Sequence, residues 1–177
     1  MLHNFQICFA DTEQFEGWHQ YSNDPVDPGG ATYSGVTQNA YNAWRTHVAQ
    51  LPIQDVRRMT DAECQTIYKT QYWDAVRGDN VWAGIDLLLY DIAVNSGPLR
   101  AIKFLQQALG VTVDGQFGLE TFGALMAVND RKALIQKICA ARMSFWHSLT
   151  TWWRFGKGWF ARGIGMEAKS LALLAAG

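Results

Sequence analysis

One segment constrains the fold more than any other: residues 82–95, WAGIDLLLYDIAVN, are apolar almost all the way round a helix. A helix with this pattern is usually buried in the middle of its domain, with other elements packed around it. Gly97-Pro98 ends the segment and starts another helix, since proline suits the first helical position. We therefore expect a helical core built around residues 82–95.

Helical patterns account for most of the remaining chain. Thr37 and Thr60 are expected N-caps, Glu63 completes a capping box after Thr60, and Gly110 is an expected C-terminal cap. Helices are expected at about residues 3–16, 37–48, 60–72, 82–95, 98–110, 119–128, 130–149 and 165–175. The predicted fold class is all-α, mainly helical, with at most one small β-hairpin near residues 25–37.

Neither an internal repeat nor a Gly/Ser-rich linker divides the 177 residues. This length suits one domain, or one domain with a small appended unit. A softer boundary lies near Gly97, which separates residues 1–96 from residues 97–177. We expect the two regions to pack into one compact unit.

Residues 15–35, FEGWHQYSNDPVDPGGATYSG, differ from the chain around them. Pro25 and Pro28 exclude a continuous helix, and the glycines argue against an ordinary strand. Long irregular segments in compact domains are usually functional or disordered, and the aromatic residues of this one argue against disorder. The run is therefore the first candidate for a functional segment.

Composition excludes several classes of function. The net charge of −1 gives no sign of nucleic-acid binding, so a helix-turn-helix DNA-binding protein is a remote alternative. No apolar stretch reaches the length of a membrane-spanning helix. The three cysteines and four histidines show no metal-ligand spacing, and His19 is interpreted as incidental. No serine-nucleophile motif and no cofactor fingerprint occurs, so neither a metal nor a cofactor is expected.

Carboxylates in the irregular run are the remaining candidates for catalysis. Glycosidic bond cleavage needs one protonated carboxylic acid at the leaving oxygen and a second carboxylate near the opposite face. Glu16, between apolar Phe15 and Trp18, is placed to have its pKa raised by desolvation, whereas Asp24 and Asp27 lie in a polar loop. A glutamate at a helix end followed by Asp-Pro turns is also common without any catalytic role.

Several motifs in this order resemble those of the lysozyme-like muramidases of glycoside hydrolase family 108. The resemblance covers about residues 5–162 and includes a small peptidoglycan-binding region. The matching residues are Phe5, Glu16-Gly17, Asp27-Pro28-Gly29-Gly30-Ala31-Thr32, Gly35-Val36-Thr37, Tyr72-Trp73, Asp91-Ile92-Ala93-Val94-Asn95-Ser96-Gly97, Leu105-Gln106-Gln107-Ala108-Leu109-Gly110, Val113-Asp114-Gly115-Gln116-Phe117-Gly118, Gly156-Lys157-Gly158-Trp159 and Arg162.

The resemblance implies a lysozyme-like catalytic region in residues 1–96 and a peptidoglycan-binding subdomain in residues 97–177. It implies an inverting β-1,4-N-acetylmuramidase in which Glu16 is the general acid, Asp27 holds the attacking water and Thr32 helps to orient that water. Trp18, Tyr21 and Tyr33 are expected to stack on N-acetyl sugars, with core packing as an equally good alternative. Asp91 and Asn95 are expected either to line the substrate cleft or to form a structural polar pair.

The chain departs from the family pattern at one important place. Trp18 stands where the family has the second glycine of E-G-G, and the spacer from Glu16 to Asp27 is longer than usual. The alternative function is therefore a non-catalytic cell-wall-binding or secretion-assisting protein. A lytic transglycosylase, which would not need Asp27, is a chemical variant of the first hypothesis.

The resemblance also implies a setting for the protein. Family members are phage or prophage endolysins and muramidases that assist secretion, some of which are called secretion activators. The N-terminus has no basic region followed by an apolar run, so we expect synthesis in the bacterial cytoplasm without a Sec signal. The expected site of action is the periplasm or cell wall, the expected partner is the peptidoglycan glycan strand, and a monomer is favoured.

Overall fold

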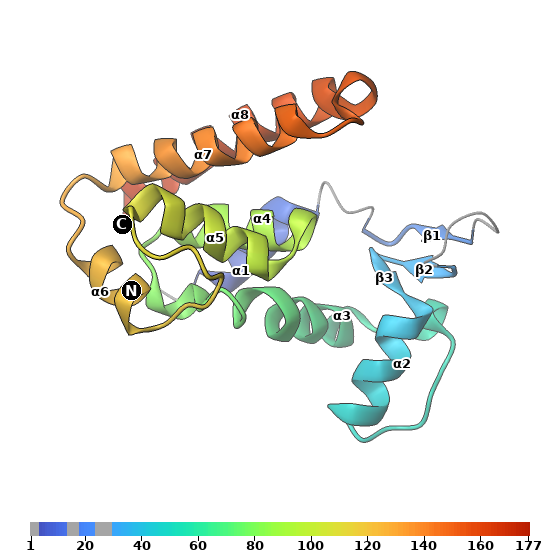
Figure 1. Cartoon of the computed structure of the whole chain (residues 1–177). Helices are drawn as coiled ribbons and strands as arrows, with labels where there is room; N and C mark the ends of the chain where they lie inside the picture. Colours follow the sequence, from blue (N-terminus) through green and yellow to red (C-terminus); the bar gives the residue numbers. More distant parts are fainter. Residues whose placement is uncertain (1–3, 14–17, 24–29) are drawn as a thin grey trace. The chain divides into compact units, whose positions relative to one another are not determined.

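The computed structural model describes residues 4–13, 18–23 and 30–177. This part of the chain is mainly helical with one small antiparallel sheet, which confirms the predicted fold class (Figure 1). The elements in chain order are α1 (Phe5–Glu13), β1 (Tyr21–Ser22), β2 (Thr32–Tyr33), β3 (Val36–Thr37), α2 (Gln38–His47), η1 (Val56–Arg58), α3 (Asp61–Tyr68), η2 (Lys69–Trp73), η3 (Gly78–Asn80), α4 (Ile85–Ser96), α5 (Pro98–Leu109), α6 (Leu119–Met126), α7 (Arg131–Ser148) and α8 (Trp152–Ala176).

The chain forms two compact units. The larger one, called here the helical unit, comprises Met1–Cys8 and Tyr72–Gly177, and the smaller one, called the sheet unit, comprises Phe9–Gln71. These units do not follow the sequence-based division into residues 1–96 and 97–177. That division concerns the catalytic and wall-binding roles of the two regions, and it stays a prediction.

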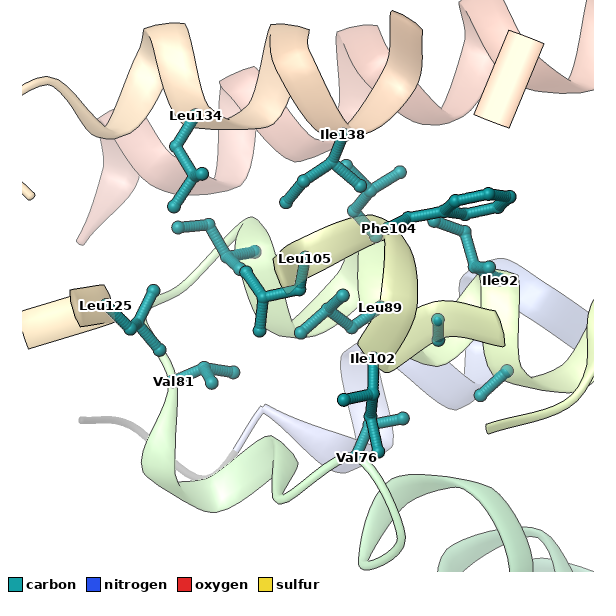
Figure 2. Close-up of a cluster of buried hydrophobic side chains, with 14 of the residues drawn as sticks. Val76, Val81, Leu89, Ile92, Ile102, Phe104, Leu105, Leu125, Leu134 and Ile138 are labelled. Atoms are coloured by element: carbon teal, nitrogen blue, oxygen red, sulfur yellow. The ribbon is translucent and has the colours of Figure 1, made fainter. Parts of the chain in front are cut away.

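The core of the helical unit forms around α4, as expected from its apolar sequence. Residues Ile85 to Ala93 of α4 are all buried, and α4 packs against α5 and α8 while α5 packs against α7. Figure 2 shows side chains from these helices meeting in one cluster, with Leu89 of α4 and Leu105 of α5 near its centre. Each fully buried leucine contributes roughly 1.5–3 kcal/mol relative to an exposed one. The buried leucines of α4 therefore stabilise the core of this unit.

Gly84 and Asp86 shape the start of α4. Gly84 has a φ of +85°, and a Cβ at this position would collide with the backbone oxygen of Ser170 in α8. Asp86 is fully buried, and it accepts hydrogen bonds from the backbone N–H groups of Gly84 (2.8 Å) and Leu87 (2.7 Å) and from Asn4 Nδ2 (2.9 Å). Burial raises the pKa of the Asp86 carboxyl, and these hydrogen bonds oppose that shift. The close approach of α8 and the hydrogen bonds of Asp86 hold the first turn of α4 in place.

A second polar centre closes the loop between α5 and α6. Gln106 is almost fully buried, and its Nε2 donates to Asp114 Oδ1 (2.7 Å) and to Thr121 Oγ1 (3.1 Å). Its Oε1 accepts the backbone N–H of Gly115 at 2.8 Å. Gly110 has a φ of +73° and ends α5, which confirms the C-terminal cap expected there.

The last helix begins earlier than the sequence indicates. A helix was expected only from residue 165, whereas α8 begins at Trp152, so that boundary is wrong. Each glycine in a helix costs roughly 0.5–1 kcal/mol relative to alanine, which disfavours the glycine-rich first half of α8. Gly163, however, lies so close to Trp146 and Met143 of α7 that a Cβ would be only 3.1–3.2 Å from their side chains. Packing of α8 along α7 outweighs the low helix propensity.

The sheet unit confirms the local signals read from its sequence. Thr37 caps α2 by accepting the N–H of Ala40, and Thr60 and Glu63 form the expected capping box of α3. The hairpin of β2 and β3 pairs Thr32 with Thr37 and Tyr33 with Val36. Both of its turn residues, Ser34 and Gly35, have positive φ, as the tight turns between paired strands require.

A polar network joins α2 to α3 within the sheet unit. Arg45 Nη1 donates to Glu63 Oε1 at 2.8 Å and to the hydroxyl of Tyr41 at 3.0 Å, while Arg45 Nε donates to the carbonyl of Pro52 at 2.6 Å. The Tyr41 hydroxyl in turn donates to Glu63 Oε2 at 3.0 Å. Burial is the main cause of the raised pKa of Tyr41. These bonds support the sheet from the side of η1 and α2.

Candidate active site

The small sheet brings three of the predicted site residues together. Tyr21 of β1 lies directly opposite Tyr33 of β2, and Ser22 lies opposite Thr32. Directly opposed residues of antiparallel strands project from the same face, so the two tyrosines form one aromatic surface. Tyr21 is 45% exposed, and the guanidinium carbon of Arg57 lies 5.5 Å from the centre of its ring. The flat apolar faces of the two tyrosine rings therefore lie beside the guanidinium group of Arg57.

Three rings follow one another beside the sheet. The centre of the His19 ring lies 5.0 Å from that of Trp18 and 6.3 Å from that of Tyr33, and the His19 and Tyr33 rings are nearly parallel at 18°. Trp18 also packs edge-on against Phe9 at 5.1 Å, and Phe9 packs in the same way against Tyr68 of α3. Trp18 therefore takes part in the packing of the unit and is also continuous with the aromatic surface of the sheet.

His19 has a defined position, although sequence reasoning interpreted it as incidental. Its Nε2 lies 2.9 Å from Asp61 Oδ1 at the start of α3, and its backbone N–H donates to Ser34 Oγ at 2.9 Å. The backbone of His19 has a φ of 59°, which is uncommon for a residue other than glycine. Ser34 is itself buried, and its carbonyl accepts the hydroxyl of Tyr68 at 3.2 Å. The only sequence signal for His19 was its place between Trp18 and Tyr21, because its partner Asp61 is 42 residues away.

The two predicted catalytic carboxylates, Glu16 and Asp27, lie outside the described residues, so their roles stay predictions. The described chain resumes two residues after Glu16, at Trp18, and three residues after Asp27, at Gly30. Thr32, the third predicted catalytic residue, is half-buried on β2, and its hydroxyl donates to the carbonyl of Gly30 at 3.1 Å.

Asp91 and Asn95 belong to α4 of the helical unit. Asp91 is fully buried and accepts Arg142 Nη1 at 2.6 Å and Arg162 Nη2 at 2.7 Å, while Asn95 Oδ1 lies 3.4 Å from Arg142 Nη2. Burial lowers the pKa of the Arg142 guanidinium, and the attraction of Asp91 opposes this shift. Of the two alternatives proposed for Asp91 and Asn95, this geometry favours the structural one.

The described part of the chain offers the means for binding a carbohydrate. Aromatic faces, hydroxyl groups and a guanidinium lie together on the sheet unit, a combination suited to rings with one apolar and one polar side. Among the described residues, no group of histidine, cysteine, aspartate and glutamate side chains is arranged to hold a metal ion. None of the helices in this part of the chain is long and apolar enough to cross a membrane.

Comparisons with known proteins agree with this picture. Residues 9–97 match the family model described as glycosyl hydrolase 108, and residues 100–164 match a model described as a predicted peptidoglycan domain. The solved structure of Brucella abortus SagA is 33% identical in sequence and superposes with a TM-score of 0.81, covering 97% of this chain and 95% of that one. No curated protein matches the chain.

These matches support a function related to peptidoglycan hydrolysis, with peptidoglycan as the partner. The first match includes the whole irregular run and the small sheet, and the second includes most of α5, all of α6 and α7, and the first half of α8. The chain therefore belongs to the glycosyl hydrolase 108 family.

Proposed function

We propose that the protein is a peptidoglycan hydrolase that cleaves the β-1,4 bond following N-acetylmuramic acid with inversion of configuration. The observation that carries this proposal is the small sheet, which sets Tyr21 opposite Tyr33 and Ser22 opposite Thr32. This sheet belongs to the segment that matches a glycosyl hydrolase family and includes the Glu16…Asp27…Thr32 order. The setting that we propose is the bacterial cell wall, in phage-type lysis or in the release of other proteins.

The proposed mechanism uses two carboxyl groups in different protonation states. Glu16 donates its proton to the glycosidic oxygen as the bond from that oxygen to the anomeric carbon breaks. Water attacks the anomeric carbon from the opposite face, and Asp27 accepts the proton that this water loses. The hydroxyl of Thr32 helps to orient the water. Inverting enzymes keep the two carboxyl groups about 6.5–9.5 Å apart, which leaves room for the water molecule.

The aromatic surface of the sheet unit serves substrate binding in this proposal. Tyr21 and Tyr33 lie against the apolar faces of N-acetyl sugars, and Trp18 extends that surface beyond His19. Arg57, next to Tyr21, forms an ion pair with Asp55, and its remaining N–H groups are offered to the lactyl or peptide carboxylates of the wall polymer. Stacking on the aromatic rings tolerates small shifts of the glycan strand along the protein, whereas hydrolysis needs the scissile bond at one position. In this proposal, binding and catalysis therefore use different residues.

A second candidate function is a non-catalytic wall-binding or secretion-assisting protein. Trp18 favours it, because a large ring that packs against Phe9 stands at the position of a family glycine, two residues after Glu16 in the sequence. One experiment with purified bacterial sacculi distinguishes the two functions. A binding protein pellets with the sacculi and leaves them intact, whereas a hydrolase releases soluble fragments.

Product analysis tests the proposed reaction directly. Digestion of sacculi is expected to release fragments with new reducing ends at N-acetylmuramic acid, and NMR of the fresh products should show the α-anomer first. The inverted anomer identifies direct attack by water. Products with anhydro ends would show a transglycosylase instead, and the absence of soluble fragments from a folded protein that pellets with sacculi would establish the binding function.

His19→Asn tests whether the row of three rings contributes to substrate binding. Asparagine tolerates a positive φ, so this variant removes the imidazole without adding backbone strain. Loss of one aromatic contact of about 1 kcal/mol predicts a KM about fivefold higher with kcat nearly unchanged. The matched control is His47→Asn, at the exposed end of α2 in the same unit. An unchanged KM for both variants would assign His19 to packing alone.

A further inference from the structure

A cavity of about 260 Å³ lies between α7 and α8 of the helical unit, and none of its lining residues is proposed for catalysis. Arg142, Met143 and Trp146 of α7 form one wall, and Phe160, Ile164 and Glu167 of α8 form the other. The two helices pack along each other over much of their length (Figure 1). Sites for whole small molecules are usually about 300–1,000 Å³, so this cavity suits a side group of a larger ligand.

An unpaired donor lies in the wall of the cavity. Arg142 is 1% exposed, and its Nη1 and Nη2 atoms are directed to Asp91 and Asn95. Its Nε–H is buried and has no hydrogen-bond partner in the described part of the chain. Buried polar groups in native proteins nearly always have a partner, so the Nε–H calls for an acceptor from outside the chain. The Trp146 ring, 4.2 Å from the guanidinium carbon, covers one face of Arg142 and keeps it in place.

The rest of the cavity is mostly apolar, and its other polar side chains are Gln136 and one carboxylate, Glu167. Ile164 is about half exposed although it lines the cavity, so an apolar surface there stays open to solvent. Cys139, also in the wall, is a neutral thiol, because burial first and the nearby Glu167 second raise its pKa to about 12. Glu167 provides the one carboxyl group among the lining residues of the cavity, on the α8 side.

These features together define the chemistry of a ligand. An acceptor oxygen suits Arg142 Nε–H, a small apolar group suits the surface of Met143 and Ile164, and an N–H donor suits Glu167. An amide group with a methyl on its carbonyl carbon, or on the carbon next to the amide, has all three. Peptidoglycan presents this chemistry in two places, the N-acetyl groups of its sugars and the alanyl units of its stem peptides.

We propose that the cavity between α7 and α8 binds a methyl-bearing amide group of peptidoglycan. This inference rests on the proposed function for the identity of the polymer. All the cavity residues named above except Glu167 lie within residues 100–164, the range matched to a predicted peptidoglycan domain. Binding in this cavity keeps the protein attached to peptidoglycan through an amide group that cleavage of the glycan strand does not change.

The test is an NMR titration of the full chain with two small ligands, triacetylchitotriose and the dipeptide D-alanyl-D-alanine. The chain carries ¹⁵N in its arginines and ¹³C in its isoleucine and methionine methyl groups. Binding is expected to shift the Arg142 Nε–H signal together with the methyl signals of Ile164 and Met143. A response to the saccharide alone identifies the N-acetyl group, and a response to the dipeptide alone identifies the alanyl unit.

A pair of matched variants makes the titration specific. Ile164→Gln removes the apolar wall at an exposed position and is expected to raise the Kd about tenfold. Leu119→Gln replaces an equally apolar residue that is 91% exposed on α6, outside the cavity, and should change the Kd less than about twofold. The inference is overturned if neither ligand shifts the Arg142 Nε–H signal, or if both variants weaken binding equally. Because no hydrolysis is needed, loss of the proposed reaction would leave this result unaffected.

Discussion

Replacing Glu16 with glutamine is expected to lower the release of soluble fragments from sacculi by about 10²–10⁴-fold, the range attributed to general acid catalysis. Glutamine has nearly the size of glutamate but has no proton to donate to the leaving oxygen. Binding of sacculi should be unchanged, because the aromatic surface and the helical unit keep their residues. The measurement is the initial rate of reducing-end release at saturating substrate, with circular dichroism to confirm that both proteins are folded.

Neighbouring carboxylates provide the controls for this experiment. Glu13→Gln changes a glutamate three residues earlier in the sequence and should leave the rate within about twofold, because Glu13 has no role in the proposed reaction. Asp27→Asn is expected to slow the reaction and Asp24→Asn to leave it almost unchanged, because only Asp27 is proposed to hold the water. If Glu16→Gln retains the full rate, the general acid is another residue, and the motif has been assigned to the wrong glutamate.

Replacing Asp91 with asparagine is expected to destabilise the helical unit by about 3–5 kcal/mol. Removal of one member of a buried ion pair leaves an uncompensated charge, and that is the cost observed in such cases. Asp91 is fully buried and shared by two guanidinium groups, with Arg142 Nη1 at 2.6 Å and Arg162 Nη2 at 2.7 Å. An asparagine oxygen can still accept hydrogen bonds, but it no longer offsets the two positive charges.

Urea denaturation followed by circular dichroism measures this loss, as a fall in the free energy of unfolding. The control is Asp61→Asn, because Asp61 and its partner His19 have side chains that are 61% and 52% exposed. An exposed pair of this kind contributes only about 0–1 kcal/mol. A stable Asp91→Asn protein that binds sacculi less tightly would contradict the structural role and return Asp91 to the cleft-wall hypothesis.

Much of the helical fold could be predicted because its signals are local. The caps at Thr37 and Thr60 depend on hydrogen bonds to groups three residues away, and the structure has both. The buried helix α4 could be predicted from its apolar residues alone. The start of α8 could not, because four glycines disfavour a helix locally and only packing against α7 stabilises it.

For the candidate site too, some features could be predicted from the sequence and others could not. The order of Glu16, Asp27 and Thr32 within a short run is visible in the sequence and indicated the family. The row of Trp18, His19 and Tyr33 could not be foreseen, because it depends on strand pairing and on a bond to Asp61, 42 residues away. For Asp91 and Asn95 the sequence allowed a cleft wall or a structural pair, and the position of Arg142 favours the second.

By itself, the sequence determined the helical class, the central helix, the capped helix ends and the family motifs. The first three follow from apolar periodicity or from residues within about one helical turn of each other, whereas the motifs are short runs that resemble those of a known family. Only the tertiary structure decided which charges are buried together, as Asp91 and its arginines lie 51 and 71 residues apart. The same is true of the cavity between α7 and α8, because Arg142 and Ile164 line one cavity only when the two helices pack together.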